Sequence, residues 1–151
     1  MKNAVRVLIG VCVVAVVFGA AYAQFAKPED AIKYRKAVMT VIAQHFGRLG
    51  AVVKGDVPYD KAQSADNAQL VQTLSSLPWE AFVVPGSDKG DTTLKSSALE
   101  DQANFMSAAE AFQNETAKLA GAAGGGDLNS IKSQFGAVAQ SCKSCHNQYR
   151  K

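Results

Sequence analysis

The chain has 151 residues, of which 48% are hydrophobic and 19% charged, a composition typical of one globular domain with its own core. Its 16 basic and 13 acidic residues give a formal net charge of +3, and the basic residues form no continuous tract. Nucleic-acid binding is excluded on that ground, because phosphate contacts require clustered Lys and Arg.

Residues 1–23 carry the pattern of a cleaved export signal. Lys2 and Arg6 precede an uncharged, largely apolar run over residues 7–21, and residues 21–23, Ala-Tyr-Ala, have the form of a cleavage site. The run is shorter than the roughly 20 residues that a membrane-spanning helix requires. We therefore predict cleavage after Ala23 and one exported domain over residues 24–151, which has 14 basic and 13 acidic residues.

The first predicted helix begins near Pro28, because proline suits a first helical turn and two acidic residues follow it. It ends at Lys54, before Gly55, which suits the left-handed position after a helix. Its apolar residues recur at intervals of three, four or seven, as expected for one buried face: Ile32, Met39, Ile42, Phe46, Leu49 and Val53.

The second predicted helix runs from Pro58 or Tyr59 to Leu77 and is stopped by Pro78. We expect its inner face to carry Ala62, Ala65, Leu70, Leu74 and Leu77. From Trp79 to about Ser96 the periodicity is lost, and the prolines and glycines there indicate a long crossover loop.

The third predicted helix starts near Ser97, where Ser97 and Glu100 have the spacing of a capping box. Four apolar residues mark its inner face: Phe105, Ala109, Phe112 and Leu119. The glycine-rich run at 121–126 predicts irregular structure, and Asp127 is a good N-cap for a last helix.

The last helix has the most regular pattern, with apolar residues at alternating steps of three and four. They are Leu128, Ile131, Phe135, Val138, Cys142, Cys145 and Tyr149. This 3.5-residue period is typical of helices packed nearly parallel in a bundle. Because no segment has the pattern of a strand, we predict an all-α fold, an antiparallel up-down-up-down four-helix bundle.

The motif Cys142-x-x-Cys145-His146 lies near the C-terminus and is compatible with three chemistries. A redox disulfide is disfavoured, because such pairs lie at helix N-termini, where the dipole lowers the pKa of a thiol. Zinc is disfavoured because a structural site needs four ligands and no second ligand pair is present. Covalent haem fits, because two thiols one helical turn apart can each form a thioether and the adjacent histidine can reach the iron.

Three segments carry a resemblance to the cytochrome c′ family: "QFAKPEDAIKYRKAVMTVIAQHFG", "LSSLPWEAF" and "CKSCHNQYRK". The resemblance implies a haem c attached near the C-terminus of a four-helix bundle, with Cys142 and Cys145 as thioether residues. It implies His146 as the proximal iron ligand and Arg150, one helical turn further along the same side, as the basic residue beside the proximal face.

On the opposite, distal face the resemblance places Met39 as the bulky apolar residue that covers the iron. It also places Arg35 near the haem edge and Trp79 between the helices. It further implies a periplasmic homodimer formed through the first helix, where Val38, Val41 and Val52 are apolar residues beyond those that one buried face needs.

Whether a side chain fills the sixth iron position decides between two functions. Met39 and His45 lie about 120° apart around their helix, so they cannot both face one haem. We expect His45 at the surface or between helices, and Met106 in the core. The position one turn before Met39, which holds the ligating methionine in low-spin relatives, is Arg35, and it cannot bind iron.

We therefore expect a five-coordinate, high-spin haem protein that binds the diatomic gases NO and CO, transfers electrons, or does both. The alternative is a six-coordinate His/Met low-spin electron carrier. No carboxylate pair, nucleophile–base pair or phosphate-binding loop is visible, so we do not expect an enzyme.

Overall fold

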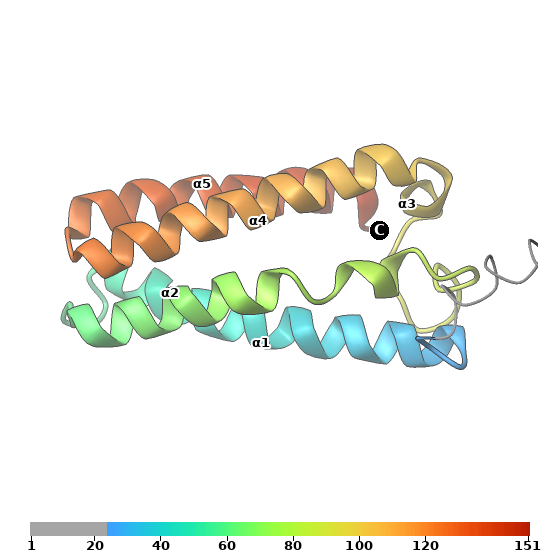
Figure 1. The fold of residues 1–151 in the computed structure, drawn as a ribbon, viewed down its shortest axis with the longest axis horizontal. Helices are drawn as coiled ribbons and strands as arrows, with labels where there is room; N and C mark the ends of the chain where they lie inside the picture. Colours follow the sequence, from blue (N-terminus) through green and yellow to red (C-terminus); the bar gives the residue numbers. More distant parts are fainter. Residues whose placement is uncertain (1–23) are drawn as a thin grey trace, which may run out of the picture.

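The structure is a computed structural model that describes residues 24–151, and the predicted signal peptide lies outside them. Four long helices form the bundle: α1 (Pro28–Lys54), α2 (Lys61–Ser75), α4 (Gln102–Gly125) and α5 (Leu128–Tyr149). Two short elements lie in the crossover, η1 (Trp79–Phe82) and α3 (Ser97–Glu100). Figure 1 shows α1 and α2 in one layer and α4 and α5 in the other. The predicted all-α four-helix bundle is confirmed.

Strand structure within residues 24–151 is limited to one isolated antiparallel bridge, between Leu94 and Arg150. The same residues contain no helix long and apolar enough to cross a membrane. The C-terminus and the chain that leads into α3 lie at the same end of the bundle (Figure 1). That end carries the cysteine motif.

The bounds predicted for α1 are confirmed. Pro28 occupies the first turn, and Gly55 follows the helix with φ 82° and donates its N–H to Val52 O. All six predicted inner-face residues of α1 are buried or half-buried. At its C-terminal end α1 contacts α5 closely, because Phe46 and Phe135 stack with ring centroids 4.1 Å apart.

The inner face predicted for α2 is largely wrong. Leu70, Leu77 and Ala62 are exposed, whereas the buried positions are Ser64, Ala68, Val71 and Ser75. Small side chains suit this position because α2 packs closely against α4. The buried hydroxyl of Ser75 is satisfied, since it donates to Gln72 O and accepts from Thr116. The helix also starts later than predicted, at Lys61, after Asp60, which caps Gln63 N–H.

The third predicted helix is divided in two. Asp101, with φ −123° and ψ 59°, separates α3 from α4. The predicted capping box is absent, because Ser96 is the N-cap and the buried Ser97 Oγ has no hydrogen-bond partner. Its four predicted apolar residues are buried as expected.

The prediction of irregular structure at 121–126 is wrong. Residues 121–125 are helical, and α4 ends only at Gly125, before Gly126, which has φ 84°. Leu119 and Ala123 are completely buried on this part of α4. Their packing outweighs the helix cost of glycine, which is about 1 kcal/mol per residue.

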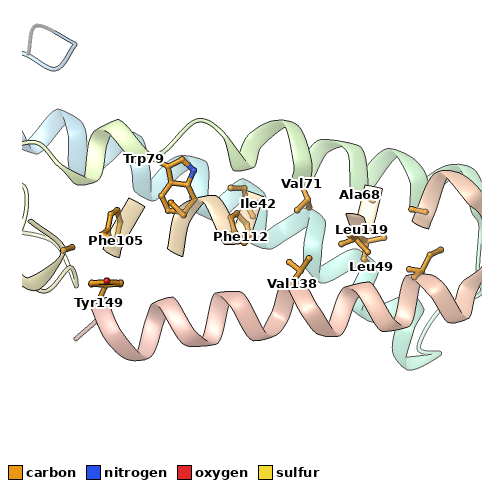
Figure 2. Packing of buried hydrophobic residues seen from close by; sticks show 14 of the residues in the cluster. Ile42, Leu49, Ala68, Val71, Trp79, Phe105, Phe112, Leu119, Val138 and Tyr149 are labelled. Carbon is orange, nitrogen blue, oxygen red and sulfur yellow. The ribbon is translucent and has the colours of Figure 1, made fainter. Parts of the chain in front are cut away.

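The prediction for α5 is confirmed at its start, where the Asp127 carboxylate accepts hydrogen bonds from Asn129 N–H and Ser130 N–H. Ile131, Val138 and Tyr149 face the core. Figure 2 shows the core running along the bundle, from Leu49, Ala68 and Leu119 at one end to an aromatic group at the other. The aromatic end is the one nearest the cysteine motif.

Candidate functional site

Cys142 and Cys145 lie in the last two turns of α5, and no disulfide joins them. Both are half-buried and pack against the core cluster, and Cys145 also borders an open groove of about 410 Å³ between α4 and α5. Burial raises the pKa of both thiols, and the neighbouring Cys145 raises that of Cys142 further. A raised pKa opposes thiolate redox chemistry, so these are thiols held against an apolar surface.

His146 is the next residue of α5, and its side chain is exposed. Its pKa is lowered first by desolvation and then by the charge of Arg150. Both effects favour the neutral imidazole, which is the form that binds a metal. The motif therefore supplies two thiols and one neutral nitrogen donor within two helical turns.

Arg150 directly follows α5, and the helical turn that starts at His146 closes on it. It is the C-cap of α5, with extended backbone angles of φ −113° and ψ 136°, and its N–H donates to His146 O over 3.0 Å. Its charge nevertheless lowers the pKa of His146. Arg150 therefore lies one turn beyond His146, although its own backbone angles are extended.

The extended conformation of Arg150 follows from pairing with the crossover. Leu94 and Arg150 form the antiparallel bridge, in which Lys95 N–H donates to Tyr149 O over 2.9 Å and Lys151 N–H to Thr93 O over 2.8 Å. We name residues 87–95 the strap. Sequence reasoning missed it because a single bridge involves too few residues to give a periodic pattern.

Arg35 holds the strap against α1. Its side chain is buried, with 2% of the residue exposed. It donates through Nη1 to Ala81 O (2.8 Å) and Ser87 Oγ (2.9 Å), and through Nη2 to Ser87 O and Thr92 Oγ1 (2.8 Å). Burial lowers the pKa of Arg35 to about 10, and Asp88 opposes this shift. These bonds use four of the five N–H groups of a guanidinium, so only Nε–H is left for another acceptor.

Met39 is half-buried and packs against the same cluster as the two cysteines. His45 donates its Nδ1–H to Asn67 Oδ1 over 2.9 Å, so it joins α1 to α2 as expected. The core position expected for Met106 is wrong, because 41% of this residue is exposed. Of the two methionines considered as a sixth iron ligand, Met39 packs against the core cluster, as the two cysteines do, and Met106 is largely exposed.

Trp79 belongs to the aromatic end of the core. Its Nε1–H donates to Ser75 O, and its ring packs edge-on against Phe105 at 6.1 Å between centroids. Phe105 in turn contacts the Tyr149 ring edge-on at 5.1 Å. Figure 2 shows these three rings together. Trp79 is thus linked through the Phe105 ring to Tyr149, which lies three positions after His146.

The side chains around the motif fit a haem better than a bare ion. Within residues 24–151 no three His, Cys, Asp or Glu side chains are arranged to hold a metal ion by themselves. The two thiols instead pack against the hydrophobic core cluster, which includes Trp79 and Phe105, and Met39 packs against the same cluster. Tyr149 is 3% exposed, and its hydroxyl has no partner, so a polar group in this region remains to be satisfied.

Comparison with known proteins decides the family. A family model described as Cytochrome C' matches residues 30–150. The cytochrome c' of Alcaligenes xylosoxydans xylosoxydans is 49% identical over 128 residues, which are 85% of this chain and 98% of that protein. The chain belongs to the cytochrome c′ family. Cys142 and Cys145 therefore hold a covalent haem c.

Solved structures of cytochromes c′ have the same fold. Cytochrome c prime from Shewanella frigidimarina matches with a TM-score of 0.82 at 44% identity, over 85% of this chain and 99% of that chain. A ferrous arginine-to-lysine variant of the Alcaligenes xylosoxidans protein with bound NO matches with a TM-score of 0.79 at 47% identity, over 85% and 98% of the two chains. A leucine-to-glycine variant of that protein with bound carbon monoxide matches with a TM-score of 0.79 at 48% identity, over 85% and 99%.

Proposed function

We propose that the protein is a high-spin, five-coordinate haem protein that binds NO and CO and also transfers electrons, with His146 as its one protein ligand to iron. The observation that carries the proposal is that Cys142, Cys145 and Met39 all pack against one hydrophobic core cluster. The NO-bound and CO-bound structures of the Alcaligenes xylosoxidans protein support gas binding as the function. No turnover of an organic substrate is part of the proposal.

Each residue of the site has a separate role. The bound haem supplies an iron that takes a diatomic ligand and exchanges one electron. Cys142 and Cys145 fix the position of the porphyrin along α5, and His146 binds the iron from one side. Met39 covers the other side with an apolar thioether, which offers no hydrogen bond to water or anions and so disfavours their entry. Arg150 presents a cation and N–H donors beside His146.

The six-coordinate His/Met electron carrier is the competing function. It requires the Met39 sulfur to bind iron, and a Met/His pair is a known axial combination that raises the reduction potential. The position one turn earlier is closed to a ligand, because Arg35 is buried there and bonded to Ala81, Ser87 and Thr92. Met39 is thus the one residue on which the two functions differ.

The rate of carbon monoxide binding to Met39→Gly tests the role of Met39. Removal of the side chain should speed binding at least tenfold, equivalent to about 1.4 kcal/mol of barrier. Ala43→Gly is the matched control, because Ala43 is exposed on the same helix and the change weakens α1 without opening the cluster. Equal rates in wild type and Met39→Gly would show that Met39 does not gate the site.

We also propose export to the periplasm, with cleavage after Ala23, and a homodimer formed through α1. Val41 is 43% exposed, and Val38 and Val52 are half-buried on the same helix, so a second copy would remove apolar surface from water. N-terminal sequencing of the exported protein tests the cleavage site. Sedimentation at micromolar concentration tests the dimer, and a monomer under those conditions would contradict it.

A further inference from the structure

The C-terminal end of α5 is unusual in how its backbone is satisfied. The last four carbonyls of a helix have no partner within the helix. In α5 these belong to residues 146–149, and His146 O accepts from Arg150 N–H. The other three accept from one residue, Lys95, because its Nζ lies 3.1 Å from Asn147 O and 3.3 Å from Gln148 O, and its N–H donates to Tyr149 O.

The strap residues that precede Lys95 are bonded to α1. Thr92 Oγ1 accepts from Arg35 Nη2 at 2.8 Å and from Leu94 N–H at 3.1 Å. A second anchor is the ion pair between Lys36 Nζ and Asp91 Oδ2 at 2.7 Å. The strap therefore joins the helix that carries Met39 to the helix end that carries His146.

We propose that Lys95 is a positioning residue of the haem site. By binding the three carbonyls that follow His146, it fixes the last turn of α5 and the extended conformation of Arg150. The His146 ring and the Arg150 side chain then keep one relative orientation. A cation at this helix end is also stabilised by the partial negative charge of the C-terminal carbonyls. The proposal deepens the proposed function, because it rests on His146 as the iron ligand.

The test uses the haem-loaded protein and three variants. Lys95→Met removes the ammonium donors and leaves the backbone N–H of residue 95. Lys95→Arg keeps the charge and can donate to two carbonyls. Lys151→Met is the matched control, because it removes one exposed cation from the same end of the chain and keeps the backbone N–H that binds Thr93 O.

Two measurements are made on each protein. Hydrogen exchange reports on the N–H groups of Arg150 and Lys151, and NMR of the ferric protein reports the shifted resonances of the His146 ring. In Lys95→Met we expect exchange at both amides to speed at least fivefold and the His146 resonances to move. In Lys151→Met and Lys95→Arg both readouts should stay close to wild type.

Unchanged exchange in Lys95→Met would overturn the proposal. Equal effects in Lys95→Met and Lys151→Met would also overturn it, because the loss of one positive charge at this end of the chain would then explain both. Faster exchange with unmoved His146 resonances would also overturn it, because Lys95 would then stabilise the chain end without positioning the ligand. Both readouts can be measured whether the iron is five-coordinate or six-coordinate. A six-coordinate iron in the wild type would contradict the proposed function, but amide exchange and the His146 resonances would still decide the role of Lys95.

Discussion

Arg35 Nη2 lies 2.8 Å from Thr92 Oγ1, although the two residues are 57 positions apart in the chain. This contact brings the crossover against the first helix, and the crossover in turn pairs with the C-terminus. Residues on α1, the strap and α5 are thus joined by consecutive hydrogen bonds. The stability of the site end of the bundle should depend on Arg35.

Arg35→Met should lower the free energy of unfolding by about 2–4 kcal/mol, because it leaves Ala81 O and Ser87 O buried without their charged donor. Lys36→Met is the control, since the Lys36–Asp91 pair is exposed and such pairs contribute about 0–1 kcal/mol. Urea unfolding of the haem-loaded proteins measures both. Equal losses in the two variants would contradict the role given to Arg35.

Truncation of two adjacent residues of α4 should change stability by very different amounts. Phe105 is 1% exposed and contacts Trp79, Phe82 and Tyr149, so Phe105→Ala should cost about 3–5 kcal/mol. Met106→Ala should change stability by about 0.5 kcal/mol or less, because Met106 is largely exposed. Thermal unfolding of both variants checks this, and a large loss in Met106→Ala would contradict the orientation of α4.

Replacement by alanine should have opposite effects on stability at two glycines near the end of α4. Gly126→Ala should cost about 1–2 kcal/mol, because φ is 84° there and an added Cβ would lie 2.7 Å from the Lys61 side chain. Gly124→Ala should stabilise by up to about 1 kcal/mol, because Gly124 is helical and an added Cβ meets no atom within 4 Å. The midpoints of denaturant unfolding of the two variants test this prediction. A more stable Gly126→Ala variant would contradict the position of the helix end.

The covalent link to haem is tested by extraction with acidified organic solvent. The double variant Cys142→Ala, Cys145→Ala should release its haem, whereas wild type should keep it through the thioethers. Ser144→Ala, in the same turn of α5, serves as the control and should retain haem. Retention in the double variant would refute covalent attachment at these cysteines.

The sequence predicted those elements whose signals are local. Pro28, Gly55 and Asp127 act on the turn in which they lie, and the alternation along α5 repeats often enough to define a face. The cysteine motif is equally local. These features identify the helix that carries the haem and its buried face, without knowledge of the segments that pack against it.

The features that were missed depend on contacts between distant segments. The buried face of α2 carries Ser64 and Ser75, because close packing against α4 selects for size rather than hydrophobicity. Helix α4 continues through Gly124 because residues beside it are buried. Lys95 reaches α5 across more than 50 positions, and nothing near Lys95 in the sequence indicates that contact.

The central claim is that the haem iron has an open sixth position. The measurement that tests it most directly is the absorption spectrum of the purified protein in the ferric and ferrous states. An open site predicts high-spin bands in both states and a split ferrous Soret band. Low-spin spectra with a far-red charge-transfer band between methionine sulfur and ferric iron would contradict the account and would assign Met39 as the sixth ligand.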